Sequence, residues 1–219
     1  MLTYLAIAER YQPRWLVWEN VPGVLSSNRG RDFGTFLGAL GQIGYGFAYR
    51  VLDAQYFGVA QRRRRVFVVG YLGDWRRAAA VLFERESLSG HPAPSRETRE
   101  DVAKTLTRGV GQRYDFESET LPVAFGAQNS ASQGDSVSEH VTPTLDKSKT
   151  PGVLQDLTVR RLTPRECERL QGFPDNYTLI PYRGKPAADS PRYKAMGNSM
   201  AVPVMRWIGQ RIQMVENIK

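Results

Sequence analysis

Apolar runs of strand length alternate with segments of helical spacing over the first 72 residues, and this alternation restricts the fold more than any other feature. A strand buried on both faces is a short continuous apolar run, whereas a helix that covers a sheet repeats its apolar residues every three or four positions. Such alternation indicates an α/β layer architecture with a largely parallel sheet. The expected helices are 4–10 and 33–43, and the expected strands are 15–18, 47–52 and 66–72.

The pattern changes after this segment. Residues 73–157 are rich in Ser, Thr, Gly, Asp and Pro and have little periodicity, a composition that disordered segments share. Aromatic residues such as Tyr114 and Phe125 interrupt the stretch and favour an irregular but ordered lobe that contains strands. We therefore predict an α/β layer formed by 1–72 and about 190–219, with this lobe between them.

Residues 158–219 contain two helices, which we expect to support the lobe and then return the chain to the layer. Thr163 and Glu166 form a capping box at the start of the first helix, and Gly172 ends it. The final helix starts near Pro203 and has an apolar face. The members of that face are Met205, Ile208, Ile212 and Val215.

The chain has a formal net charge of +8 and a pI of about 9.8, a balance that favours polyanionic partners, with nucleic acid first. Cys167 is the one cysteine, which excludes an intrachain disulfide and a thiolate metal cluster. His91 and His140 match no ligand spacing, so we expect no metal. Mean hydropathy is −0.43, and no membrane-span length of apolar sequence or secretory signal is visible, so we expect a cytoplasmic protein.

One carboxylate, Glu19, ends the first apolar strand directly before the turn Val21-Pro22-Gly23. Sites in open α/β sheets form at the carboxyl ends of strands. Burial there would favour the protonated carboxyl, which suits Glu19 to hold or donate a proton. A salt-bridged or helix-capping glutamate explains the same position equally well.

Four consecutive arginines, 62–65, follow Gln61 and lead directly into the third apolar strand. Because side chains alternate along a strand, Arg63 and Arg65 point to one side and the other two arginines to the opposite side. One pair can reach a base or a phosphate while the other pair stays in solvent. A basic patch with general phosphate affinity is the simpler interpretation.

Two later stretches, 162–174 and 196–204, each precede or contain a helix start. The second places two small polar residues, Asn198 and Ser199, before the final helix. Free backbone N–H groups at a helix N-terminus can bind oxygen atoms of a ligand. Either stretch alone is typical of an ordinary helix entry.

Taken in order, these stretches resemble the later motif blocks of the DNA cytosine-C5 methyltransferase family. The family's Glu-Asn-Val block matches 19–21, and its Gln-x-Arg-x-Arg block matches 61–65. Its Leu-Thr-Pro-Arg-Glu-Cys-x-Arg-Leu-Gln-Gly-Phe-Pro block matches 162–174, and its terminal Gly-Asn-Ser block matches 197–199. Four blocks in the family's order, over nearly the whole chain, make the resemblance specific.

The resemblance implies part of a Rossmann-like sheet that binds S-adenosylmethionine, with a small β-containing target-recognition domain at 73–157. It implies a reaction on duplex DNA in which the target cytosine is flipped out, a cysteine thiolate adds to C6, and C5 receives the methyl group of S-adenosylmethionine. A bacterial or phage setting, such as restriction and modification, is also implied. The implied roles are Glu19 at cytosine N3, Arg65 at the base edge, Arg63 behind the catalytic loop or at a phosphate, Asn198 and Ser199 at the cofactor, and Asn20, Gln61, Arg62 and Arg64 at DNA.

The chain departs from the family's pattern where the chemistry begins. It contains neither the Gly-containing cofactor loop nor the Pro-Cys block that carries the nucleophile, and Cys167 lies in the capped helix, where a packed side chain is expected. We therefore expect the isolated chain to be inactive. Three hypotheses stay open: the C-terminal piece of a cytosine-C5 methyltransferase, a subunit that needs a separate N-terminal chain with the cysteine and cofactor loop, and a non-catalytic DNA-binding module.

Overall fold

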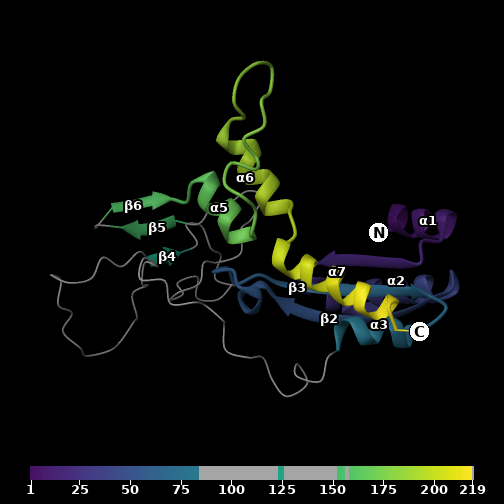
Figure 1. Cartoon of the computed structure of the whole chain (residues 1–219). Coiled ribbons are helices and arrows are strands. Elements are labelled where there is room, and N and C mark those ends of the chain that lie inside the picture. Colours follow the sequence, from purple (N-terminus) through teal and green to yellow (C-terminus); the bar gives the residue numbers. More distant parts are fainter. Residues whose placement is uncertain (84–122, 126–151, 156–157, 219) are drawn as a thin grey trace, which may run out of the picture. The chain divides into compact units, whose positions relative to one another are not determined.

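The computed structural model describes residues 1–83, 123–125, 152–155 and 158–218, and they belong to two compact units (Figure 1). The described part of the first unit is 1–53, 64–83 and 204–218. The second unit contains 54–63, three short strands and the chain up to 203. Most of the expected recognition domain, 73–157, lies outside the described residues.

The first unit is built on a three-stranded sheet in the order β1–β3–β2. Strand β3 (Arg64–Leu72) pairs antiparallel with β1 (Trp15–Asn20) on one side and with β2 (Tyr45–Asp53) on the other. The expectation of a largely parallel sheet is therefore wrong for the described strands. Strands β1 and β2 run in the same direction, but β3 lies between them in the sheet. Strand β3 is antiparallel to β2 because residues 54–63 are too short for the long crossover that parallel neighbours need.

Helices α1 (Leu2–Tyr11) and α2 (Arg31–Gln42) confirm the two helices expected in this part of the chain, and two short 3₁₀ turns precede α2. Phe36 and Leu40 of α2 are fully buried against Val66 and Val68 of β3. The rings of Trp18 and Phe36 lie 4.5 Å apart at their centroids and link β1 to the same core. The apolar residues that recur at helical spacing over 33–43 thus form the buried face of α2.

Helix α3 (Trp75–Leu82) corrects the expected boundary at residue 72, because it packs on β2 and β3 in the first unit. Asp74 caps its start by accepting a hydrogen bond from the backbone N–H of Arg76 at 2.9 Å. At its end, Arg50 and Arg211 donate to the carbonyl oxygens of Leu82 and Val81. A helix of eight residues, three of them alanine, was too short to give a periodic signal, so the sequence did not predict it.

The final helix, α7 (Val202–Glu216), confirms the one expected from Pro203. Its residues Val204, Ile208 and Val215 are buried. Glu216 accepts hydrogen bonds from the indole of Trp15 at 2.6 Å and from Arg14 at 3.0 Å, which joins the helix to the start of β1. None of the described helices has the length and apolar character needed to cross a membrane.

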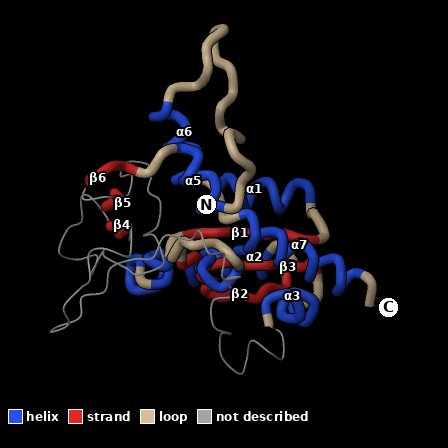
Figure 2. Tube along the Cα trace, turned by 60° about the vertical axis from the view of Figure 1, so that its left-hand side comes forward, coloured by secondary structure: helices blue, strands red, loops and turns tan. Residues whose placement is uncertain are grey.

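The second unit contains a small antiparallel sheet, β4 (Val123–Phe125), β5 (Gly152–Gln155) and β6 (Thr158–Arg161), drawn in red in Figure 2. Helix α5 (Pro164–Gln171) follows, with the capping box of Thr163 and Glu166 confirmed and Gly172 ending it at φ 78°. The sequence did not predict α6 (Asp189–Asn198). Residues 190–203 therefore belong to this unit, and the return to the first unit begins later than expected.

We expect Gly46→Ala to destabilise the first unit. A Cβ at this position of β2 would lie 2.2 Å from the backbone nitrogen of Trp75, so the strand or the start of α3 would have to move. The free energy of unfolding, measured in urea by tryptophan fluorescence, should fall by about 1–3 kcal/mol. Gly38→Ala is the matched control, because a Cβ there meets nothing within 4 Å; it should raise stability by about 0.5–1 kcal/mol. Equal stability of the two variants would contradict the close packing of β2 on α3.

Candidate active site

Glu19 lies at the carboxyl end of β1, and the register of the sheet brings Arg65 to it. Glu19 is opposite Phe67 in the β1–β3 ladder, and Arg65, two residues before Phe67, projects from the same face. The Arg65 Nε atom lies 3.1 Å from Oε1 of Glu19, and the two side chains are 14% and 19% exposed. The sequence allowed either a buried, protonated Glu19 or a salt-bridged one. The structure shows an ion pair, and the sequence did not identify Arg65 as the partner.

The residues after Glu19 shape the turn that ends the strand. The side-chain oxygen of Asn20 accepts a hydrogen bond from the backbone N–H of Val21 at 2.8 Å. A 3₁₀ turn, Pro22–Leu25, follows and buries Val24 in the core. The first motif block therefore consists of a strand end and a tight turn that holds the Glu19 side chain at the edge of the sheet.

The four arginines alternate in burial as expected, with Arg62 and Arg64 exposed and Arg63 only 4% exposed. The Nη2 atom of Arg63 donates to the carbonyl oxygen of Ser199 at 2.6 Å, with that of Gly197 at 3.5 Å. Arg63 thus joins the second motif block to the fourth. Arg63 therefore holds backbone, whereas Arg62 and Arg64 are exposed residues.

Gln61 is completely buried, and its side-chain amide has no hydrogen-bond partner among the described residues. A buried amide without a partner costs about 1–3 kcal/mol. Because Gln61 is not exposed here, its expected contact with DNA stays a prediction. Gln61 and Arg63 are both buried, and Arg62 between them is exposed.

Helix α5 holds the third block against the fourth. The Gln171 side chain donates to the carbonyl oxygen of Met196 at 3.0 Å, and a Cβ on Gly172 would lie 2.6 Å from Pro203. Cys167 is 1% exposed in the same cluster. Burial, together with the negative charges of Glu166 and Glu168, raises the pKa of its thiol to about 12. The thiolate that a nucleophile requires is therefore strongly disfavoured at this position.

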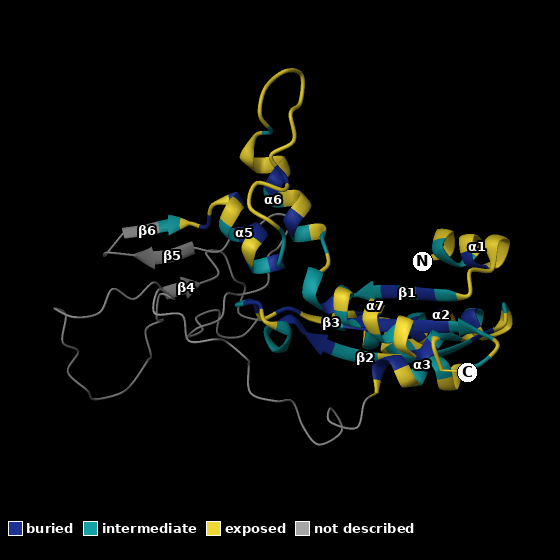
Figure 3. Ribbon diagram, viewed as in Figure 1, coloured by how far each residue is buried: buried dark blue, intermediate teal, exposed yellow. Residues whose placement is uncertain are grey.

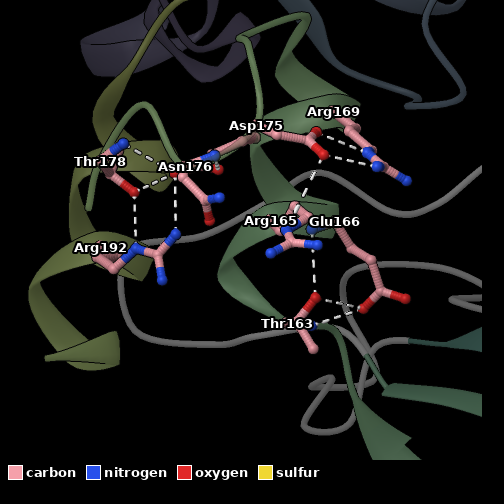
Figure 4. Close-up of polar contacts among 9 residues, drawn as sticks. Thr163, Arg165, Glu166, Arg169, Asp175, Asn176, Thr178 and Arg192 are labelled. Carbon is pink, nitrogen blue, oxygen red and sulfur yellow. Dashed lines mark hydrogen bonds and ion pairs between the residues drawn. The ribbon is translucent and has the colours of Figure 1, made fainter.

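A buried polar cluster behind α5 was not predicted from the sequence (Figure 4). The carboxylate of Glu168, which is not exposed at all, accepts hydrogen bonds from the backbone N–H groups of Asn176 and Thr178, from the Thr178 hydroxyl, and from Arg192 at 3.1 Å. Burial alone would raise the pKa of Glu168, but these donors outweigh it and hold the pKa below its usual value. Arg192 also donates to the Thr178 hydroxyl at 3.0 Å, so α5, α6 and the chain between them meet at one carboxylate.

The Gly-Asn-Ser block forms the end of α6. The sequence predicted only that it precedes the final helix. Ser199 caps α6: its backbone N–H donates to the carbonyl oxygen of Ala195 and its hydroxyl to that of Met196 at 2.9 Å. The Asn198 side chain is exposed and makes no hydrogen bond with the described residues. Among those residues there is also no group of three or more side chains that could ligate a metal.

A model of the family of C-5 cytosine-specific DNA methylases matches residues 1–122 and 125–214. The chain belongs to this family. A protein of Escherichia phage P1, named DNA N-6-adenine-methyltransferase, is 30% identical over 348 aligned positions, which cover 92% of this chain and 46% of that protein. The type II methyltransferase M2.BsuMI of Bacillus subtilis is 30% identical over 92% of this chain and 49% of its own length. The chain thus spans about half the length of these relatives.

The structure of the Dnmt2 methyltransferase of S. pombe superposes with a TM-score of 0.58, at 17% identity, over 94% of this chain and 66% of that one. This likeness confirms the α/β methyltransferase fold of the C-5 cytosine methylase chain.

For this C-5 cytosine methylase chain we expect Glu168→Gln to lower the free energy of unfolding by about 3–5 kcal/mol at pH 7, because it removes the buried carboxylate that pairs with Arg192 and leaves only the exposed carboxylate of Asp189, 3.7 Å away. The sign of the pH dependence follows from the lowered pKa of Glu168. The stabilisation is fully present above the ordinary carboxyl value of 4.5 and is lost as pH falls through the lower value of the folded state. Urea unfolding between pH 7 and pH 3 should therefore show the difference between wild type and variant shrinking only in acid.

The matched control is Glu9→Gln, on the exposed face of α1, which should change stability by less than about 0.5 kcal/mol. A Glu168→Gln variant as stable as Glu9→Gln would show that the cluster around Glu168 does not hold the second unit together.

Proposed function

We propose that residues 1–219 form part of a methyltransferase that transfers the methyl group of S-adenosylmethionine to C5 of cytosine in duplex DNA. The Glu19–Arg65 pair is the observation that carries this proposal. The Watson–Crick edge of cytosine offers two neighbouring acceptors, N3 and O2. A carboxyl group that takes up a proton and an adjacent guanidinium can donate to both, and the 3.1 Å separation of Glu19 and Arg65 suits such neighbours.

The chemistry that this pair supports is activation of the ring. Addition of a thiolate to C6 makes C5 nucleophilic and places negative charge toward N3. A proton held by Glu19 at N3 stabilises that charge, and Arg65 orients the base through O2. After C5 has received the methyl group it loses its proton, and the thiolate leaves C6. The donors act only on a base that has been flipped out of the duplex.

Two observations support roles for other residues. Arg63 is a positioning residue, since its guanidinium holds the backbone of Ser199 and makes no approach to solvent. S-adenosylmethionine supplies an electrophilic methyl group when bound, and the exposed Asn198 amide fits a role in holding it better than Ser199, whose hydroxyl closes α6. Arg62 and Arg64, both exposed, are proposed to contact DNA phosphates.

Adenine N6 methylation is the alternative that the name of the phage P1 protein raises, although most of that protein has no counterpart in this chain. Two chemical arguments favour cytosine. Adenine has no oxygen acceptor beside the ring nitrogen of its Watson–Crick edge, so Arg65 would have no acceptor next to the atom that Glu19 contacts. Adenine N6 is itself the atom that attacks, so a carboxyl that protonates a ring nitrogen would serve no step.

The thiol is proposed to come from outside residues 1–219, either from another part of a longer chain or from a separate subunit, because the one cysteine here is buried and its pKa is raised. A non-catalytic DNA-binding module is the remaining alternative. It differs in that no added polypeptide would give it activity.

Tritium transfer from labelled S-adenosylmethionine to duplex DNA tests the proposal. We expect no transfer by 1–219 alone, and transfer when a polypeptide carrying the family's cofactor loop and Pro-Cys block is added. Glu19→Gln should then reduce the rate by about 10²-fold or more, since it removes an acid acting in the transition state. Cys167→Ala, the control, should stay within about twofold. Digested DNA should contain 5-methylcytosine; N6-methyladenine, or activity of 1–219 alone that Cys167→Ala abolishes, would contradict the proposal.

A further inference from the structure

The chain between α5 and α6 extends away from both helices as a narrow loop, drawn as exposed in Figure 3. Its apolar residues are not used in any core: Ile180 is 65% exposed and Tyr182 is 66% exposed. Residues 179–186 are all exposed. The motif blocks on either side do not account for this loop, which we call the tip.

The tip has a defined conformation. Tyr182 and Lys185 exchange two backbone hydrogen bonds, at 2.8 and 3.2 Å, and enclose Arg183 and Gly184, whose φ angles are 52° and 74°. Positive φ at both central residues is the pattern of a type I′ hairpin turn. Below the turn, the Glu168 carboxylate holds the backbone N–H groups of Asn176 and Thr178. The loop is therefore tied both at its end and at its base.

The charge of the tip has one sign. Arg183 and Lys185 lie at its end, and the sequence from 176 to 188 contains no acidic residue. Neither cation has an ion-pair partner among the described residues, and the Arg183 guanidinium lies 5.1 Å from the centroid of the Tyr182 ring. Two cations and an aromatic ring on a tight turn can contact phosphates and stack on sugars or bases.

We propose that the tip, residues 179–186, is a DNA-contacting element separate from the arginines of the second motif block, with Arg183 and Lys185 on phosphates and Tyr182 and Ile180 against the sugar or base. The proposal rests on the proposed function, because it takes duplex DNA as the partner. The charge of the tip favours a polyanion over an apolar protein surface, and the net charge of the chain, +8, has the same sign. A turn already formed loses little conformational entropy on binding.

The test is binding of residues 1–219 to a short fluorescein-labelled duplex, followed by anisotropy between about 50 and 200 mM salt. The main variant is Arg183→Gly with Lys185→Gln, since glycine accepts the positive φ and keeps the turn. Loss of two phosphate contacts should reduce the slope of log K against log salt by about 2 and weaken binding about tenfold at 100 mM salt. Tyr182→Ser should weaken binding and leave the slope unchanged.

The matched control removes the same charge elsewhere: Arg10→Ala with Arg206→Ala, two exposed arginines of the first unit. It should keep most of the wild-type slope. An unchanged slope and affinity in the tip variant, with its circular dichroism intact, would overturn the proposal, as would an equal loss in the control. Normal DNA binding by the tip variant with failure to work with the complementing polypeptide would assign the tip to a protein contact instead. Absence of DNA binding by the wild type would overturn this proposal and the DNA substrate together. DNA binding by 1–219 with no methylation even after the complementing polypeptide is added would overturn only the proposed reaction.

Discussion

Pairing of β3 between β1 and β2 is the constraint on which the first unit depends. The register sets Glu19 and Arg65 on one face of the sheet, so a shift by a single residue would send the Arg65 side chain to the opposite face. The same strand supplies three fully buried valines, Val66, Val68 and Val69, and α2 and α3 pack against the sheet that it completes. The site geometry and the stability of this unit therefore have the same origin.

The motif blocks divide into groups with different physical roles. Glu19 and Arg65 present charged groups at the edge of the sheet, partly open to solvent. Arg63 and Gln171 instead donate to backbone carbonyl oxygens of the Gly-Asn-Ser segment and its neighbour Met196. A match to the motif blocks of an enzyme family therefore does not make every matched residue catalytic, since Arg63 and Gln171 hold backbone carbonyl groups in or beside the fourth block.

Local signals were enough for much of the fold, and failed where distant residues decide. The capping box at Thr163 was predictable because its partners lie three residues apart, and the buried strands from their apolar runs. The antiparallel direction of β3 could not be predicted, since the direction of the strand depends on the path of residues 54–63. The Glu168–Arg192 pair joins residues 24 apart, and a charged residue in a helix gives no sign that it is buried. Glu19 could be singled out because a carboxylate at a strand end is visible in the sequence, and its role in catalysis stays a prediction.

The central claim is that this chain holds the base while a thiol from elsewhere attacks it. Covalent trapping on a duplex containing 5-fluorocytosine tests it directly. Release of the thiolate requires loss of a proton from C5, and because fluorine replaces that hydrogen, the thiol stays bonded to C6. Mass spectrometry of the trapped peptide identifies that thiol. We expect an adduct only when the complementing polypeptide is present, on a cysteine outside residues 1–219. An adduct on Cys167, or one formed by 1–219 alone, would contradict the claim.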